Sequence, residues 1–409
     1  MTDKSFFPII LGSDENAYGT ARIFNREYGI KPLLLCTRLL VPTQHSRLFT
    51  VKIIENFSKN DVFVRELSKI LMQYKEKYEK LVVVSCSDYY TALMSENYEK
   101  FEGLVSNPFP EFDLLEKLDT KDRFYAMCEQ HGIDYPETVV ADKDERLSAL
   151  DKLTFGFPIV VKPENSNAKE YLDCEFNGKK KVFFFDTAEE YLEMVKEMNK
   201  SGYSGKLIIQ RFIKGDDSAM RVMNCYSDKN GKVRAMCLGQ PVLEEYHPKS
   251  LGNYAAIISR CDDALYKKIK KFLEDIGYTG FSNFDMKYDA ENGKYYLMEI
   301  NPRPGRSSFY VYASGMNLMQ CMLSDVFDEN KECIFGQNTT LWANVSKYVM
   351  FKYTENLQIR AEMKKLVKEK KYMRTLDCKE DRNIKRFLKI KRYYLGQCRS
   401  YKKYYFKKG

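Results

Sequence analysis

The chain has few of the residues on which metal centres and histidine-assisted catalysis usually depend. Only three of its 409 residues are histidine, so a histidine-rich metal site is nearly excluded and a Ser-His-Asp hydrolase has few candidates for its base. The 11 cysteines are an odd number and include no C-x-x-C pair, which argues against a zinc site and against a disulfide framework. We therefore expect chemistry that uses carboxylate, lysine and arginine side chains.

The sequence also lacks a long hydrophobic run. No segment approaches the length of a membrane-spanning helix, and the apolar run at 6–11 is too short for a signal peptide. These features predict a cytoplasmic protein. Hydrophobic residues make up 44% of the chain, which is enough for a large core, and the length suggests two or three domains.

Apolar runs at 7–11, 32–36 and 81–86 alternate with helical segments in the first part of the chain. Such an order predicts a parallel sheet covered on both faces, with ligands bound beyond the carboxyl ends of its strands. From 157 to 301, clusters of strands punctuated by helices predict an α+β region. We expect an α/β domain at 1–118, an α+β domain at 119–330 with a smaller subdomain at about 138–215, and an extension at 331–409.

The strongest local signal for chemistry lies on two neighbouring expected strands. Asp285 lies on the first, and Glu299 and Asn301 lie on the second, beyond a hairpin turn at 289–293. Glu299 and Asn301 are two residues apart and share a face, and antiparallel pairing can bring Asp285 beside them. Apolar neighbours flank all three, and buried carboxylates need a partner. Two carboxylates and an amide oxygen suit Mg²⁺, with ordinary solvated strand faces as the alternative.

Two lysines are candidates for binding phosphate. Lys162 ends a buried strand directly before Pro163, where it is well placed as a fixed point charge. A strand-end lysine that reaches out to solvent is the alternative. Lys121 stands near the start of a helix, where its charge opposes the helix dipole unless a phosphate is near. Taken alone, Lys121 has the character of an ordinary surface lysine.

A strand that runs into a glycine turn at 207–217 offers groups for a nucleotide. The strand end presents backbone groups to an adenine edge, and Asp217 could hold ribose hydroxyls, with an ordinary acidic turn as the alternative. Three arginines complete the set: Arg221, and Arg303 and Arg306 just after Asn301. Guanidinium groups can grip a transferred phosphoryl group and an anionic intermediate.

The order of these motifs over about 119–306 resembles that of the ATP-grasp ligases. The resemblance implies an ATP-grasp fold preceded by a parallel-sheet pre-ATP-grasp domain and followed by the basic extension, with ATP and two Mg²⁺ ions bound. It implies these roles: nucleotide phosphates for Lys121 and Lys162; adenine for Gln210, Phe212 and Ile213; ribose for Asp217; Mg²⁺ for Asp285, Glu299 and Asn301; the acyl phosphate for Arg303.

Further segments resemble the bacterial D-aspartate ligases and run through nearly the whole chain. They lie at 8–22, 214–222, 252–254, 278–288, 305–309 and 382–387. Those enzymes add D-aspartate to the side-chain amine of the third residue of a peptidoglycan precursor peptide. The resemblance implies ATP, D-aspartate and a UDP-linked muropeptide as substrates.

The sequence departs from the family pattern in two places. The familiar Gly-rich phosphate loop between the first two ATP-grasp strands is absent, and residues 164–169 stand there, so we expect Ser166 and Asn167 to supply its contacts. Gln210 replaces the commoner acidic residue near adenine. Neither change touches the expected metal ligands. The polar stretch at 165–181 is the expected lid.

The implied reaction is an ADP-forming ligation in two steps. A carboxylate attacks the γ-phosphate while Mg²⁺ and basic side chains balance the charge, and an amine then attacks the acyl phosphate. Asp88 and Asp14 are candidate bases by their loop positions alone. Two alternatives stay open: a ligase that joins another amino acid, and an ATP-binding regulatory protein. The intact set Asp285, Glu299 and Asn301 counts against the second.

The net charge of +9 is unevenly distributed. Residues 360–409 hold 19 Lys and Arg against five Asp and Glu, a charge of +14, so the rest of the chain carries about 9 − 14 = −5. This tail could lie on anionic lipids at the inner face of the membrane, bind the diphosphate of the substrate, or simply be a solvated surface. Nucleic acid ranks lower because no RNA-binding motif accompanies the tail.

Overall fold

Two structural units divide the chain, and each contains segments that are distant in the sequence. The structure, a computed structural model, describes residues 5–164, 169–248, 250–329 and 331–405. One unit, here called the large unit, comprises residues 1–115, 216–285 and 300–409, and the small unit comprises 116–215 and 286–299. Both boundaries near the candidate metal ligands fall inside strands, after Asp285 and after Glu299.

The large unit begins with a four-stranded parallel sheet of order β3-β2-β1-β4. Its strands are β1 (Phe6–Leu11), β2 (Leu33–Cys36), β3 (Thr50–Ile53) and β4 (Lys80–Ser85). The sequence predicts three of these strands, and the parallel sheet is confirmed. The edge strand β3 is not predicted because all four of its residues are exposed and it shows no apolar run.

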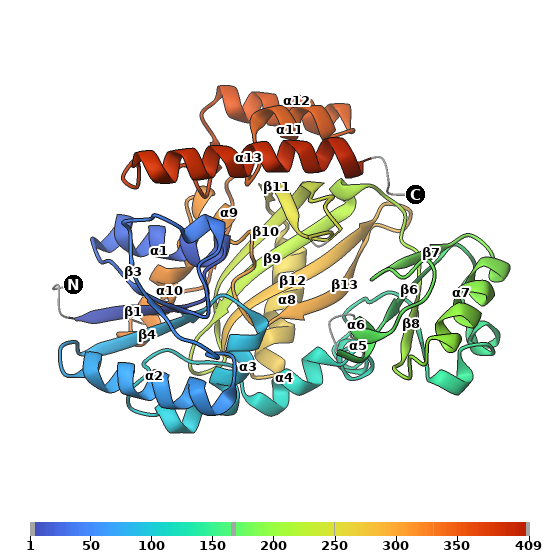
Figure 1. Ribbon diagram of the computed structural model, residues 1–409, viewed down its shortest axis with the longest axis horizontal. Helices are drawn as coiled ribbons and strands as arrows, with labels where there is room; N and C mark the ends of the chain where they lie inside the picture. Colours follow the sequence, from blue (N-terminus) through green and yellow to red (C-terminus); the bar gives the residue numbers. More distant parts are fainter. Residues whose placement is uncertain (1–4, 165–168, 249, 330, 406–409) are drawn as a thin grey trace. The chain divides into compact units, whose positions relative to one another are not determined.

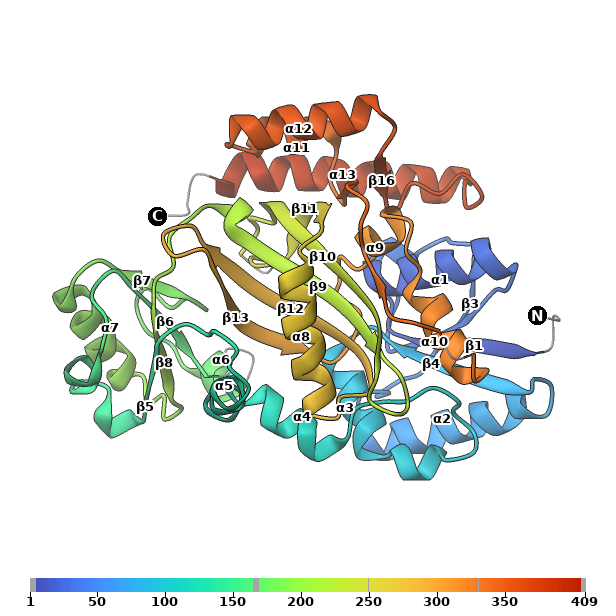
Figure 2. The same ribbon diagram turned by 180° about the vertical axis from the view of Figure 1, so that it is seen from behind.

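Helices cover both faces of this sheet because alternate strand residues point to opposite sides. Ile10, Leu34 and Val82 pack with Ala17 and Phe24 of α1 (Glu15–Tyr28). The residues between them on the strands pack instead with α2 (Asn60–Lys75) and α3 (Asp88–Glu96). Figures 1 and 2 show α1 and α2 on opposite faces of the sheet.

The carboxyl ends of β1 and β4 lie side by side, and the chain passes there into the loops that start α1 and α3. Gly12 follows β1 with a φ of 134°, and a Cβ at this position would lie 3.1 Å from the Cβ of Cys86. Only glycine therefore suits this close approach. From β1 the sheet extends in one direction through β2 and β3 and in the other direction through β4. Open parallel sheets bind ligands at the carboxyl ends of the strands where the strand order reverses in this way, which here is between β1 and β4.

A second sheet of eight strands forms the middle of the chain, in the order β13-β12-β9-β10-β11-β15-β16, with β14 paired to β10. Its strands are β9 (Met220–Ser227), β10 (Val233–Glu244), β11 (Tyr254–Arg260), β12 (Gly280–Asp289), β13 (Lys294–Asn301), β14 (Ile334–Phe335), β15 (Leu341–Ala343) and β16 (Tyr372–Arg374). Helices α8 (Asp263–Asp275), α9 (Phe309–Ala313) and α10 (Leu318–Val326) belong to the large unit. Strands β15 and β16 come from the expected C-terminal extension, which therefore adds to this sheet.

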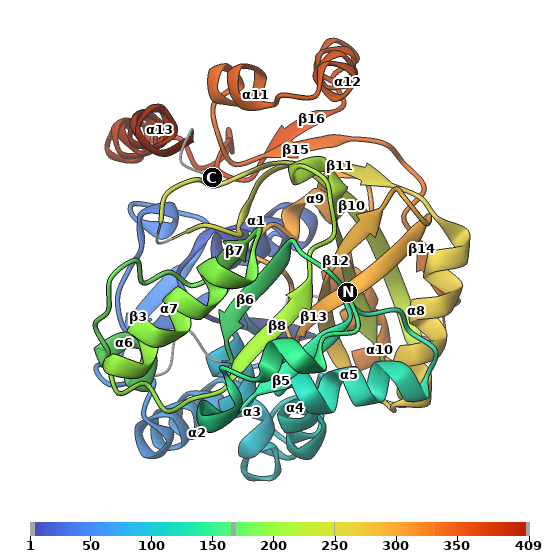
Figure 3. The same cartoon turned by 90° about the vertical axis from the view of Figure 1, so that its right-hand side faces the viewer.

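The small unit contains an antiparallel sheet of order β5-β8-β6-β7. Its elements are α5 (Lys121–Gln130), β5 (Thr138–Ala141), β6 (Ile159–Pro163), α6 (Lys169–Asp173), β7 (Phe183–Phe185), α7 (Ala188–Lys200) and β8 (Leu207–Arg211), and α4 (Phe112–Asp119) spans the boundary. One face of the sheet packs against α7 through Val161, Phe183 and Ile209 (Figure 3). The α+β character expected of this region is confirmed.

The last part of the chain forms α11 (Lys347–Tyr353), α12 (Leu357–Lys368) and α13 (Ile384–Tyr404). Arg386 anchors α13 to the large unit. Its Nε lies 2.8 Å from Asp381 Oδ2, and its Nη1 donates to the carbonyls of Pro42 and Gln44. Tyr18 also donates to Asp381, and the Arg386 guanidinium lies 4.1 Å from the Tyr18 ring centroid. Of the helices in the described ranges, none combines the length and the apolar character needed to cross a membrane.

We expect D381A to destabilise the large unit by about 3–5 kcal/mol, because it leaves the Arg386 charge buried without its partner. Both side chains of this pair are at most 4% exposed. The measurement is urea denaturation followed by the fluorescence of Trp342, the single tryptophan, which is buried in the same unit. D275A, which breaks the exposed pair with Lys271, is the control and should change stability by less than about 1 kcal/mol. Equal effects of the two variants would contradict a structural role for Asp381.

Candidate active site

Lys162 and Gln210 lie on the same face of the small sheet. In the pairing of β6 with β8, Val160 lies opposite Gln210 and Lys162 opposite Ile208, and these positions alternate with the residues that pack against α7. The face opposite α7 therefore carries a lysine and an amide side chain. The sequence singles out both residues, but only the strand register places them together.

Lys121 and Glu299 meet within the small unit. The Lys121 ammonium lies 3.4 Å from Glu299 Oε2 and donates to the carbonyl of Met298 at 3.0 Å. Burial lowers the pKa of Lys162 to about 8, the charge of Lys121 adds to the lowering, and the charge of Glu299 opposes it. The ammonium groups of Lys121 and Lys162 thus repel one another, because the single carboxylate of Glu299 cannot neutralise both. A polyanion such as a nucleotide phosphate chain would relieve this repulsion.

Gln210 holds a buried acceptor without a partner. The residue is 1% exposed, and its Nε2 donates to Tyr125 Oη and to Thr138 Oγ1, both at 2.9 Å. Its Oε1 is buried with no hydrogen-bond partner among the described residues. An unsatisfied buried carbonyl is costly, so the site fits a ligand that brings an N–H donor. Next along the chain, the Phe212 ring lies 5.9 Å from that of Phe184, and Ile213 is buried.

Asp285 and Asn301 lie side by side in the large unit, as the sequence predicts. Asp285 Oδ2 accepts from Asn301 Nδ2 at 3.1 Å, and its Oδ1 accepts from Tyr254 Oη at 2.8 Å. Glu299 stands two residues before Asn301 on β13, and its side chain is 48% exposed. In the described ranges no group of three or more His, Cys, Asp or Glu side chains that could hold a metal ion is found. Two carboxylates and an amide oxygen fit Mg²⁺.

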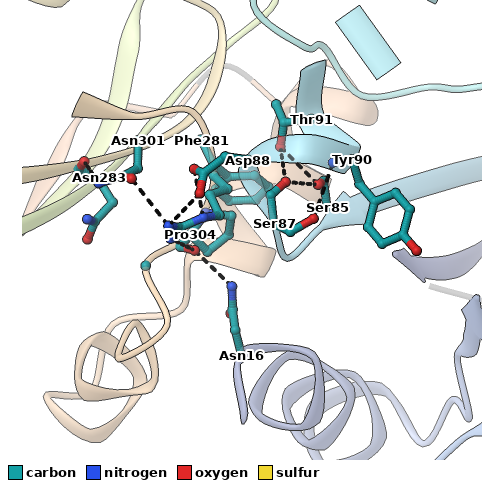
Figure 4. A network of polar contacts seen from close by, with 12 residues as sticks. Asn16, Ser85, Ser87, Asp88, Tyr90, Thr91, Phe281, Asn283, Asn301 and Pro304 are labelled. Atoms are coloured by element: carbon teal, nitrogen blue, oxygen red, sulfur yellow. Dashed lines mark hydrogen bonds and ion pairs between the residues drawn. The ribbon is translucent and has the colours of Figure 1, made fainter. Parts of the chain in front are cut away.

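Arg303 forms a two-pronged ion pair with Asp88 in the large unit. Its Nε lies 2.9 Å from Asp88 Oδ1, its Nη2 donates to Oδ2 at 2.9 Å, and Nη2 also donates to Asn301 Oδ1 at 3.2 Å. Figure 4 shows this network, with Asn301 on one side and the loop at Ser87 and Asp88 on the other. Burial opposes the charge of Arg303, but Asp88, Asp14 and Asp285 together raise its pKa above the ordinary value. Because Asp88 holds the guanidinium with both oxygens, its position favours an orienting role over that of a base.

Arg306 lies among buried carboxylates that the sequence does not single out for chemistry. Its Nη2 lies 3.3 Å from Glu245 Oε1, which also accepts from Asn344 Nδ2 at 3.0 Å. Glu15 is 1% exposed, and burial raises its pKa to about 7, with Glu245 adding to the rise and Arg306 opposing it. The only sequence signal for Glu15 is its place directly after Asp14, beyond the first strand. Asp14 itself caps α1 by accepting from the Ala17 N–H at 3.0 Å.

The remaining predicted residues lie where β8 leads into β9. Asp217 Oδ2 accepts from the Glu244 N–H at 2.9 Å and from Tyr246 Oη at 3.0 Å. Arg221 donates through Nη1 to the carbonyls of Ser218 and Met220, both at 2.7 Å, within its own turn. Ser166 and Asn167, expected to replace the missing glycine loop, lie outside the described residues, as does the first part of the expected lid.

Comparison with known proteins identifies a family model and a relative that match this chain. Residues 121–324 match the family model described as carbamoyl-phosphate synthase L chain, ATP binding domain. Over 412 aligned residues, the chain is 38% identical to a D-aspartate ligase of Enterococcus faecium (strain Aus0004), covering 98% of this chain and 97% of that protein. The similarity thus includes both the first sheet and the C-terminal helices.

Two solved structures share the fold. An N5-carboxyaminoimidazole synthetase from Staphylococcus aureus aligns with a TM-score of 0.60 and 13% identity, over 86% of each chain. The biotin carboxylase domain of 2-oxoglutarate carboxylase from Hydrogenobacter thermophilus aligns with a TM-score of 0.57 and 12% identity, over 81% of this chain and 72% of that one. The second was solved in complex with MgADP.

We expect the affinity of this protein for ATP to fall as the pH rises through about 8, because Lys162 loses its proton there in the protein without bound nucleotide. A bound phosphate chain favours the charged lysine, so the loss should approach about tenfold per pH unit above that pKa. K162R keeps its charge and should remove this dependence, whereas K162M should bind weakly at every pH. Calorimetric titration with a non-hydrolysable ATP analogue and Mg²⁺ from pH 6.5 to 9.5, values chosen to span the pKa, provides the measurement. An identical fall in wild type and K162R would assign the dependence to another group.

We expect E15Q to stabilise the protein at pH 8 relative to wild type. The pKa of Glu15 rises on folding from 4.5 to about 7, so the folded state retains a proton that the unfolded state releases between these values. Wild-type stability should therefore fall as the pH rises through this window, by up to about 3 kcal/mol, and the advantage of E15Q should vanish below pH 4.5. Urea denaturation of both proteins at pH 5 and pH 8, read by Trp342 fluorescence, measures the difference. A difference that does not change with pH would show that Glu15 has an ordinary pKa.

Proposed function

The chain belongs to the D-aspartate ligase family of ATP-grasp carboxylate–amine ligases, and from this we propose that it joins D-aspartate to a peptidoglycan precursor. In the proposed reaction the side-chain carboxylate of D-aspartate becomes an acyl phosphate, and the side-chain amine of a UDP-linked muropeptide then displaces the phosphate. The observation that carries this substrate assignment is the 38% identity to a D-aspartate ligase over 98% of the chain.

We propose that residues between Lys121 and Asp217 bind the nucleotide. Lys121 and Lys162 would neutralise the phosphates, which supplies the anion that their mutual repulsion favours. Gln210 Oε1 would accept an N–H of adenine, since that oxygen is buried without a partner in the described ranges, and Phe212 and Ile213 would contact the ring. Asp217 would hold the ribose, and Ser166 would contact phosphate.

Asp285, Glu299 and Asn301 would hold two Mg²⁺ ions, which polarise the γ-phosphate and offset its charge when bound. The side chains around this set do the rest by position and charge. Arg303, oriented by Asp88, would stabilise the charge that develops on the transferred phosphoryl group, and Arg306 and Arg221 would bind the anionic intermediate. Because Arg303 is already held in place, little reorganisation is needed as the reaction proceeds.

The experiment that tests the proposal is phosphate release from ATP and Mg²⁺ with each D- and L-amino acid, with and without a UDP-linked muropeptide that has a free side-chain amine. D-aspartate-dependent release, together with a mass gain of one aspartyl unit on the muropeptide, would establish the reaction. Release with a different amino acid would keep the ligase chemistry and move the substrate. If ATP binds but no pairing releases phosphate, the ligase assignment is wrong and a regulatory role takes its place.

We expect D285N and E299Q to lower kcat/KM for phosphate release by at least about 100-fold, with partial recovery at high Mg²⁺, because each removes a charged oxygen ligand. The control is E291Q, in the turn of the same hairpin, where the exposed Glu291 carboxylate lies 2.8 Å from the exposed Lys214 ammonium. That variant should keep wild-type activity. Equal activity of D285N and wild type at every Mg²⁺ concentration would remove Asp285 from the metal site.

A further inference from the structure

Helix α13 presents a strongly basic face that takes no part in the site described above. The helix contains five lysines, three arginines and no acidic residue. Six of these cations are exposed: Lys385, Lys391, Arg392, Arg399, Lys402 and Lys403. Four large apolar side chains are exposed on the same helix, namely Ile384 at 80%, Phe387 at 60%, Leu388 at 59% and Leu395 at 51%.

The exposed residues form one continuous stripe with an apolar middle. At 100° per residue, Ile384, Leu388 and Leu395 fall within about 40° of one another around the helix. Lys391 lies on one side of this apolar line, and Arg392 and Arg399 lie on the other. Over 21 residues the stripe is about 30 Å long. Apolar side chains flanked by cations are the pattern of a helix that lies in the interface of a membrane.

The inner face of the same helix is fixed to the large unit at both ends. Arg386 is 3% exposed and pairs with Asp381, and Ile390 is buried one turn later. Tyr401 is 2% exposed and donates to the carbonyl of Glu244, and Tyr405 donates to the carbonyl of Tyr353 at 2.7 Å. The outward stripe is therefore presented by a folded helix and need not be released from the core to meet a partner.

We propose that the outward face of α13 docks on a membrane surface that contains anionic lipids. The cations are attracted by the lipid headgroups, and the apolar line enters the boundary between headgroups and acyl chains. A second copy of the chain is a poor occupant, because it would bring the same positive face against this one. Single-stranded nucleic acid binds through a row of exposed aromatic rings. On this helix Phe387 is exposed, but Tyr393, Tyr394 and Tyr404 are only partly exposed, and Arg374 lies over the ring of Tyr394. This surface proposal does not depend on the identity of the amino acid that the enzyme joins.

The test is co-sedimentation of the full-length protein with vesicles of phosphatidylcholine alone, or of phosphatidylcholine mixed with phosphatidylglycerol. We expect binding to the mixed vesicles only, and weaker binding as salt rises. The variant K391Q/R392Q/R399Q should bind about 100-fold more weakly, from about fivefold for each charge removed near the surface. L388Q/L395Q should also lose binding, because it removes the apolar line without changing charge.

The matched control is K267Q/K268Q/K271Q, which removes three exposed cations from α8 and changes the net charge by the same amount. It should bind the mixed vesicles like wild type. ATP-dependent phosphate release should be unchanged in all three variants, which shows that each is folded. Equal loss in the α8 control, equal binding to neutral vesicles, or no binding by wild type would each overturn the proposal. It would also fail if an RNA oligonucleotide, and not the mixed vesicles, required Lys391, Arg392 and Arg399.

Discussion

The ion pair between Arg303 and Asp88 is the interaction on which the arrangement of the candidate-site residues in the large unit depends. It ties the segment after β13 to the loop after β4, at the carboxyl ends of the parallel sheet. Neighbouring contacts complete the attachment: Asn16 Nδ2 donates to the Pro304 carbonyl at 2.8 Å, and the Gly305 N–H donates to Asn224 Oδ1 at 2.7 Å. A Cβ on Gly305 would lie 2.3 Å from Asn283 Oδ1, so a larger residue here would displace that buried side chain. Arg303 and Arg306, which follow β13, are thus positioned by backbone contacts and by charge together.

Each charged group of the candidate site has a protein partner that a substrate would have to replace or share. Lys121 pairs with Glu299, Asp285 accepts from Asn301, and Arg303 pairs with Asp88. These contacts keep the charges in place without leaving them unpaired, which would be costly where water is limited. The exceptions are Lys162 and Glu15, whose pKa values move toward neutrality because burial is not fully compensated. A site built in this way responds to a ligand through both charge and protonation.

The sequence predicts relations that depend on local periodicity, and misses those that depend on distant pairing. Asn301 and Asp285 could be placed together because they lie in one hairpin, and the three buried strands of the first sheet could be read from their apolar runs. The shared face of Lys162 and Gln210 could not be predicted, because it requires the register of strands almost 50 residues apart. Glu245 pairs with Arg306, and the charge of Arg306 also acts on Glu15. Because these three residues are far apart in the sequence, no local pattern marks the two glutamates.

Strand β10 is longer than its sequence suggests, and its additional residues contact helix α13. From the sequence alone, a strand that begins at Val233 is expected to end at Leu238, because Gly239 and Pro241 follow and such residues usually interrupt strands. The observed strand continues to Glu244, and its register with β11 shifts at Pro241 and Leu243, where the irregularity absorbs the missing donor. This extension carries Glu244 far enough for its carbonyl to accept from Tyr401 of α13. The buried side of the basic helix therefore depends on the end of β10. Residues 331–405 of the C-terminal extension are part of the large unit and not a detached charged tail.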